Sequence, residues 1–211
     1  MTLAHWNQRF FSSTRGRIIM LLRRGSRTVD ELAVALSLTD NAVRAHLATL
    51  ERDGFVQQRG VRRGSGKPSF VYDLAPEAEN LFPKSYGQVL YQLLEALDER
   101  MTSEELEDLL RIVGRRIADQ WNVPNGNLRV RLEAATEVLN ELGGMAELEI
   151  GEETYCIRGY SCPLVAAVPG HPEVCRLAET LLTHLVGVPV KEQCERNGTV
   201  RCHFVVNDLA S

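Results

Sequence analysis

The first third of the chain repeats apolar residues at intervals of three and four, a period that predicts short amphipathic helices. The expected helices cover residues 15–24, 29–36 and about 40–53. Thr28 and Glu31 form a Thr-x-x-Glu capping box at the start of the second helix. A tight turn over residues 37–39 separates it from the third, whose exposed face is polar. This is the helix-turn-helix arrangement.

Two short apolar stretches after the third helix, at residues 55–56 and 70–72, predict a pair of strands. The segment between them, RGVRRGSGKP, contains three glycines and four basic residues. Such a hairpin exposes its tip, and its glycines allow close approach to a surface. The alternative is a solvated hairpin without a partner. Because it follows a helix-turn-helix, we interpret it as a wing and expect a winged helix-turn-helix domain over residues 1–76.

Two broader apolar stripes follow and predict a pair of longer helices at residues 84–100 and 103–121. The stripes consist of Val89, Leu90, Leu93, Leu94 and Leu97, and of Leu106, Leu109, Leu110, Val113 and Ile117. Two interpretations are open, an intramolecular core pair and a homodimer interface. We favour the dimer, because two DNA-binding domains read the two half-sites of a palindromic operator. Residues 77–124 are therefore expected to be a helical connector and dimerisation region.

From residue 125 onward the pattern mixes helical and strand periods. A helix is expected over 128–142 and another over 172–187, with Pro172 in its first turn. The stretches MAELEI, ETYCIRG and TVRCHFVV alternate as strands do. Residues 125–211 thus read as a small α+β sensor domain. The fold class of the chain is α+β: an N-terminal winged helix-turn-helix, a helical connector, and a small C-terminal α+β domain that carries the cysteines.

Charge is divided between the two ends of the chain. Residues 1–76 contain 12 lysines and arginines against six acidic residues, a net of +6, whereas the remainder has 12 against 22, a net of −10. A basic head on an acidic body indicates that only the head meets a polyanion. We find no Ser/His/Asp arrangement, phosphate loop or HExxH motif, so we expect no enzyme. No stretch resembles a membrane span or a secretory signal, which predicts a cytoplasmic protein without membrane contact.

The third helix and the wing supply the candidate contacts to double-stranded DNA. Asn41 and Arg44 are expected to read base edges in the major groove, and the wing to contact phosphate or the minor groove. His46 lies beside them and either contacts DNA or packs under the helix. The full candidate set is Thr39, Asp40, Asn41, Arg44, His46, Arg62, Arg63, Ser65 and Lys67.

All five cysteines lie after residue 155. In the cytoplasm thiols are reduced by default, and an odd number argues against a simple disulfide framework. Cys162 is expected in a loop, Cys175 in the first turn of a helix, Cys194 at the end of a short strand, and Cys202 facing inward on the next strand. Cys156 reads as an ordinary strand residue.

The gaps C-x12-C, C-x18-C and C-x7-C contain no C-x2-C pair, so the usual zinc-ribbon spacing is missing. Three interpretations are open. The cysteines pack as small hydrophobic residues, or they hold zinc as a four-cysteine site or one that recruits His171 or His203, or four thiolates hold a [4Fe-4S] or [2Fe-2S] cluster. Spacing alone does not separate zinc from a cluster.

The segment TVDELAVALSLTDNAVRAHLATLERDGFV resembles the DNA-binding core of bacterial winged-helix repressors. Its part VRAHLATLERDGFV and the wing RRGSGKPSFVY are similar to the SufR-type subgroup, which senses iron–sulfur clusters. SCPLVAAVPGHPEVC is similar to the cluster-binding segment of that subgroup, and GTVRCHF to its terminal cysteine. The third cysteine departs from the spacing in some relatives, so the fourth ligand is Cys194, Cys156, a histidine or an outside donor.

The resemblance implies an iron–sulfur cluster held by Cys162, Cys175 and Cys202 with Cys194 next, and [4Fe-4S] ahead of [2Fe-2S]. It also implies a repressor whose cluster-bound form acts on genes of cluster assembly. We therefore predict a DNA-binding transcriptional regulator that senses iron or redox status. The alternative is a winged-helix regulator without a cluster, in which the C-terminal domain contains structural zinc, binds a small ligand or undergoes thiol oxidation.

Overall fold

The computed structural model describes residues 9–63, 68–151, 154–196 and 200–207. The chain forms two compact units, which meet in sequence between Lys84 and Ser85. Each unit has its own hydrophobic core. The two are therefore described separately.

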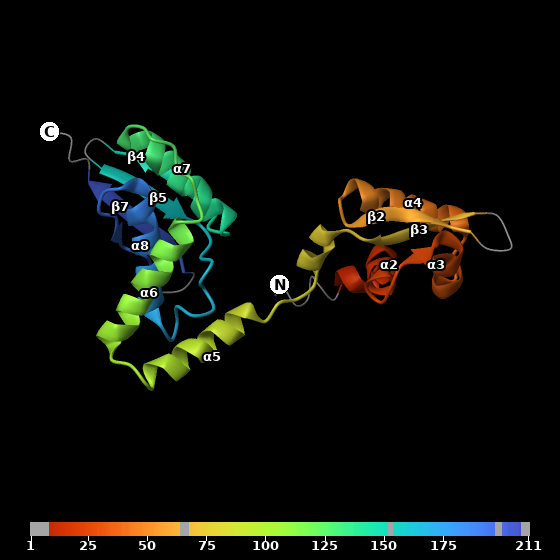
Figure 1. Ribbon diagram of the computed structural model, residues 1–211, viewed down its shortest axis with the longest axis horizontal. Coiled ribbons are helices and arrows are strands. Elements are labelled where there is room, and N and C mark those ends of the chain that lie inside the picture. The colour runs from red at the N-terminus through yellow and green to blue at the C-terminus, as the bar shows by residue number, and fades with distance from the viewer. Residues whose placement is uncertain (1–8, 64–67, 152–153, 197–199, 208–211) are drawn as a thin grey trace. The chain divides into compact units, whose positions relative to one another are not determined.

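The N-terminal unit consists of a helical layer and a small antiparallel sheet (Figure 1). Its helices are α2 (Thr14–Arg23), α3 (Val29–Leu36) and α4 (Asp40–Arg52). Its strands are β1 (Arg27–Thr28), β2 (Val56–Arg62) and β3 (Ser69–Leu74), in the order β1-β3-β2. A 3-10 helix, η1 (Pro76–Leu81), follows the sheet.

Side-chain caps fix the turn between α3 and α4. The hydroxyl of Thr28 accepts a hydrogen bond from Glu31 N (3.2 Å), and the carboxylate of Glu31 accepts one from Thr28 N (2.7 Å), so the predicted capping box is confirmed. Ser37 ends α3 with a left-handed backbone, φ 58°. Thr39 then caps α4 by accepting a hydrogen bond from Ala42 N. These caps hold the two helices at the spacing of a helix-turn-helix.

The core of the N-terminal unit comes from the inward faces of its three helices. Val43, Leu47 and Leu50 of α4 are buried, as the apolar period predicted. They pack with residues of α2, α3 and the sheet, including Ile18, Ile19, Leu22, Leu32, Leu36, Val56 and Tyr72. With α4 anchored by one face, its opposite face is left to solvent.

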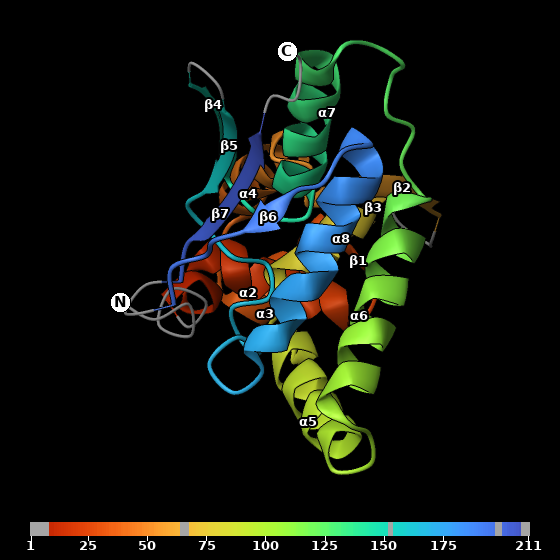
Figure 2. The ribbon, with the colours of Figure 1, turned by 90° about the vertical axis from the view of Figure 1, so that its left-hand side faces the viewer.

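The C-terminal unit combines helices with a four-stranded antiparallel sheet (Figure 2). Its helices are α5 (Tyr86–Asp98), α6 (Ser103–Ala118), α7 (Leu128–Glu141), the 3-10 turn η2 (Pro172–Val174) and α8 (Cys175–Val186). Its strands are β4 (Ala146–Ile150), β5 (Thr154–Gly159), β6 (Lys191–Glu192) and β7 (Cys202–Asn207), in the order β4-β5-β7-β6. The α+β fold class is thus confirmed.

Helix α8 lies at the centre of this unit. It packs along α6 and also contacts α7 and β6. The approach to α6 is close at Gly114, where a Cβ atom would lie 2.5 Å from the carbonyl oxygen of Leu177. Leu106 and Leu110 of α6 are buried in the shared core. Hence α6 is an integral core helix of the cysteine-bearing unit.

The apolar stripe of α5 divides into two rows. Leu94 is buried, and Leu90 and Leu97 pack against the core. By contrast, Val89 and Leu93 are 64% and 54% exposed, in a row with the exposed Tyr86. Only part of the stripe is therefore used within the chain.

The structure differs from the sequence-based expectations at several element ends. The helix expected over 172–187 begins with the η2 turn, so Cys175 is the first residue of α8. Strand β6 ends at Glu192, two residues before Cys194. Within the described part of the chain, none of the helices combines the length and apolar character needed to cross a membrane.

Candidate functional site

The exposed face of α4 presents the predicted base-reading residues. Thr39, Asp40, Asn41 and Arg44 are all exposed, on the side of the helix away from its buried row. His46 is half-buried. The first two turns of α4 thus offer a polar surface suited to the edges of bases.

The wing is the hairpin of β2 and β3, which pair in antiparallel register with an irregularity between Gln58 and Gly60. Arg62 and Arg63 are exposed. Arg62 already has a partner, because its guanidinium donates to the Glu31 carboxylate at 2.7 Å. Ser65 and Lys67 lie outside the described residues.

Four of the five cysteines line one cavity of about 130 Å³ in the C-terminal unit. Cys162 comes from the loop after β5, Cys175 from the start of α8, Cys194 from the segment after β6, and Cys202 from the start of β7. The rest of the lining is apolar and includes Leu139, Leu164, Leu181 and Phe204. Segments distant in sequence therefore place four sulfur atoms around a single small space.

Strand geometry accounts for two of these positions. Cys202 lies on the buried face of β7 with Phe204 and Val206, as the alternation predicted. Cys194 is held beside β7, because His203 N donates to its Sγ at 3.3 Å. The ladder continues past it through a bridge between Glu195 and Arg201. The predicted turn at Asn197-Gly198 lies outside the described residues.

The fifth cysteine, Cys156, stays apart from this group. In β5 it alternates with the buried Ile157, so its side chain lies on the other face of the sheet. Its register partners are Glu149 and Val205. Burial raises the pKa of its thiol, with a smaller contribution from Glu149.

The four clustered thiols are coupled by hydrogen bonds. The bond between Cys162 and Cys202 lowers the pKa of Cys162 and, together with burial, raises that of Cys202 to about 12. The bond with Cys194 and burial raise the pKa of Cys175. For Cys194, the bond from Cys175 acts downward, but the bond to Cys202 and burial outweigh it and raise the pKa to about 12. A metal would have to displace protons from most of these thiols.

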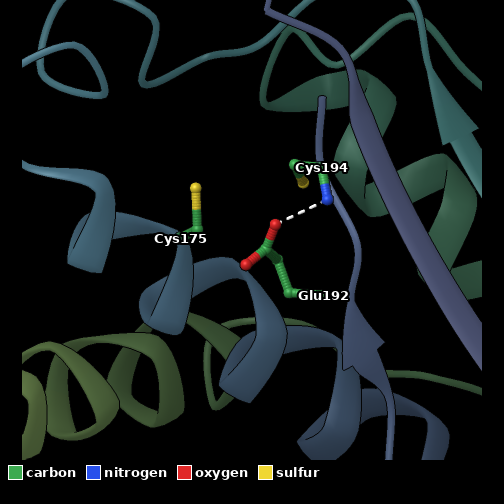
Figure 3. Close-up of side chains that lie close together, drawn as sticks. All are labelled: Cys175, Glu192 and Cys194. Atoms are coloured by element: carbon green, nitrogen blue, oxygen red, sulfur yellow. Dashed lines mark hydrogen bonds between the residues drawn. The ribbon is translucent and has the colours of Figure 1, made fainter. Parts of the chain in front are cut away.

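A carboxylate completes the group. One oxygen of Glu192 and the sulfurs of Cys175 and Cys194 all lie within 4.8 Å of one another (Figure 3). The carboxylate accepts hydrogen bonds from Cys194 N at 2.5 Å and from the guanidinium of Arg196 at 2.6 Å. Sequence reasoning missed Glu192. Its one signal was its place two residues before a candidate ligand.

Neither histidine considered as a ligand lines the cavity. The ring of His171 is buried and lies between two carboxylates, with Nε2 3.0 Å from Glu95 and Nδ1 3.0 Å from Glu173. His203 follows Cys202 on β7, so strand alternation turns its side chain away from the buried face.

The helix-turn-helix and its wing define the N-terminal unit as a winged-helix DNA-binding domain. Residues 12–58 match the family model described as bacterial regulatory protein, arsR family. The chain is thus a DNA-binding transcriptional regulator with an ArsR-family domain, and not an enzyme.

A second family model, described as the D component of cellulose synthase, matches residues 74–181. This segment is half of the chain, so the chain belongs to that sequence family between η1 and α8. The match ends before Cys194 and Cys202 and therefore includes only part of the cysteine cavity.

Two solved structures are similar over much of their own length. Lactococcus lactis ZitR, as a C30AH42A mutant in apo form, is 19% identical with a TM-score of 0.28, covering 57% of this chain and 99% of that one. Bacillus subtilis PadR in complex with operator DNA is 16% identical with a TM-score of 0.30, covering 84% and 96%. Both superpositions are too loose to transfer residue roles. No curated protein sequence matches the chain.

Proposed function

We propose that the protein is a SufR-type repressor whose C-terminal cysteines bind an iron–sulfur cluster, [4Fe-4S] rather than [2Fe-2S], and thereby sense iron or redox status. The observation that supports this most is the convergence of Cys162, Cys175, Cys194 and Cys202 on one cavity. Four thiolates are a donor set that such clusters take. The exclusion of Cys156 from the cavity is consistent with its proposed role as an ordinary strand residue.

When bound, a cluster would supply redox- and iron-dependent bonds to sulfur. The protein's own contribution is to bring together a loop, a helix start and a hairpin that are otherwise connected only by packing. For structural zinc, such cross-linking contributes on the order of 10 kcal/mol to folding. Ordering of these three segments would therefore depend strongly on occupancy of the site.

The loop between Cys162 and Cys175 gives this change a route toward the DNA-binding unit. Within the C-terminal unit it packs on α5, where His171 contacts both Glu95 and the ring of Tyr91. At Gly170 a Cβ atom would lie 2.7 Å from that ring. Since α5 is the first helix after the winged-helix unit, a loop held at both ends by ligands biases the helix that leads to the DNA-binding surface.

We propose that the repressor acts in the cytoplasm as a homodimer on a palindromic operator. The exposed row of Tyr86, Val89 and Leu93 on α5 supports dimerisation, because it leaves apolar surface available to a second copy. Arg44 and Asn41 would read base edges, with Thr39, Asp40 and His46 beside them. Arg62, Arg63, Ser65 and Lys67 would contact the backbone or minor groove.

Anaerobic reconstitution with iron and sulfide tests the cluster. Each cysteine is replaced by Ser in turn, and iron content and visible absorbance are recorded. Replacement at 162, 175 or 202 should remove most of both, whereas Cys156→Ser should keep both. Cys194→Ser shows whether that thiol is the fourth donor. Full retention of iron and sulfide in the first three variants would rule out the cluster.

The second candidate function is a regulator with structural zinc in the same site. It is favoured by the Glu192 oxygen beside two sulfurs, because zinc takes mixed sulfur and oxygen donors. Protein isolated anaerobically with bound zinc, and unable to take up iron and sulfide, would establish this function. A colourless, metal-free protein that loses thiols on mild oxidation would indicate a thiol-redox sensor instead.

A further inference from the structure

Glu192 is the one carboxylate that the described structure groups with the clustered cysteines as potential metal ligands. It lies between Cys175 and Cys194, with the three donor atoms within 4.8 Å of one another (Figure 3). Donors around a tetrahedral zinc are about 3.5–4 Å apart, given bonds of about 2.3 Å to sulfur and 2.0 Å to oxygen. Small side-chain movements would therefore bring all three onto one ion.

The position of this carboxylate is fixed by the surrounding chain. One oxygen accepts from Cys194 N at 2.5 Å and the other from Arg196 at 2.6 Å. The backbone is anchored as well, because Glu192 N donates to Glu179 at 2.9 Å and Glu192 pairs with Phe204 across the sheet. Carboxylates that bind metals are typically held in this way by groups behind them.

Burial argues that Glu192 does more than pair with Arg196. Its side chain is only 8% exposed, whereas that of Arg196 is 40% exposed. A buried carboxylate loses hydration, which a half-exposed guanidinium offsets only in part. An anionic oxygen beside two sulfur donors is instead stabilised by a cation in the cavity. Glu195, three residues further along, is exposed and offers a matched comparison.

We propose that Glu192 is a direct ligand of the metal centre and shares one coordination position with Cys194, in turn, while Cys162, Cys175 and Cys202 hold the others. This rests on the proposed metal centre and adds a ligand to it. In the exchange, a metal–oxygen bond forms as the metal–sulfur bond of Cys194 breaks, and the released thiolate takes a proton from solvent. The carboxylate form thus leaves Cys194 as a free thiol while the site stays closed.

Cobalt(II) binding to the full chain tests the shared position without iron–sulfur assembly. Anaerobic titrations compare the wild type with Cys194→Ala, Glu192→Gln, the double variant and the control Glu195→Gln. Both single variants should bind one Co²⁺ with a tetrahedral spectrum. Cys194→Ala should have weaker thiolate-to-cobalt absorption. The double variant should bind at least about 100-fold more weakly than either single variant, and Glu195→Gln should match the wild type.

Two results separate the ligand from the centre. If the double variant binds Co²⁺ as tightly as Cys194→Ala, Glu192 is no ligand, although the metal centre stands. If the wild type takes up no cobalt, zinc or iron, the centre itself is wrong and the ligand with it. A second measurement avoids reliance on the folding of the double variant. Infrared difference spectra should show a metal-dependent carboxylate band in the wild type that Glu192→Gln lacks, and a wild type without this band overturns the proposal.

Discussion

At the scale of single residues, the DNA-binding unit places its charged side chains in different environments. Arg44 is exposed on α4, on the face opposite the buried Val43 and Leu47. Arg62 on the wing is exposed too, but it is paired with Glu31, the same carboxylate that caps α3. A contact to DNA would therefore add a partner for Arg44 and exchange one for Arg62.

Replacing Arg44 by Ala should cost about 1–3 kcal/mol in binding to the specific operator and relax discrimination at one base pair. Binding to random duplexes should change little, because a base contact contributes nothing there. Arg63→Ala is the comparison, since a phosphate contact weakens binding to all sequences alike. Fluorescence anisotropy on specific and random duplexes measures both. Equal weakening on the two duplexes by Arg44→Ala would contradict its assigned role.

Replacing Glu31 by Gln should strengthen DNA binding. Gln preserves the capping box, because it also reaches the backbone N–H of Thr28, but it removes the anion that competes with phosphate for Arg62. The slope of log K against log salt should steepen by roughly the amount expected of one phosphate contact, about 0.9. Glu77→Gln, an exposed carboxylate of η1, controls for net charge. An unchanged salt slope would show that Arg62 does not meet phosphate.

The sequence predicted the outward face of α4 well and the carboxylate of the candidate metal site not at all. Period alone places Val43, Leu47 and Leu50 inside, which leaves Asn41 and Arg44 outside. Glu192 has no comparable signal. Its position depends on pairing between β6 and β7 and on a hydrogen bond from Cys194 N, which are contacts that no local pattern encodes.

At the scale of elements, the close packing of α6 on α8 determines where Cys175 lies. Gly114 allows this approach, since its Cα faces the backbone of α8 at Leu177. The long helices were predictable because each shows several turns of a 3.6-residue period. The two-residue strands β1 and β6 were not, since so short a stretch shows no period and depends on a distant partner strand.

Gly114→Ala should destabilise the C-terminal unit by roughly 1–3 kcal/mol, because the added methyl group must push α6 and α8 apart. Metal affinity should fall as well, since the start of α8 carries Cys175. Arg115→Ala, on the exposed side of α6, should stay within about 0.5 kcal/mol of the wild type. Denaturant unfolding followed by circular dichroism measures both. A wild-type midpoint for Gly114→Ala would show that the helices accommodate the methyl group.

At the scale of the whole molecule, the regulator consists of two units that share no core. The convergence of four cysteines from distant segments could not be predicted from their spacing, because the gaps fit no common metal motif. It was anticipated through the resemblance to SufR-type regulators. The division of the α5 stripe into a buried and an exposed row also appears only with the fold.

Leu93→Glu should dissociate the proposed homodimer, because it places a charge in the exposed apolar row of α5. The variant should keep its fold, since Leu93 is 54% exposed in the single chain. Gln92→Glu, at the neighbouring exposed position, is the control. Sedimentation gives the oligomeric state, and binding to a full palindrome against a half-site gives the consequence for DNA. A dimeric Leu93→Glu variant would place the interface elsewhere.

The separate cores also bear on how the protein is made. Domains fold as units during synthesis, the N-terminal one first. The winged-helix core is complete by Phe82, whereas the first clustered cysteine is residue 162 and the last is residue 202. On the ribosome, the DNA-binding unit can therefore fold before any ligand has been translated. Each new chain would then test the metal supply of the cell only at the end of its synthesis, with its DNA-binding unit already folded.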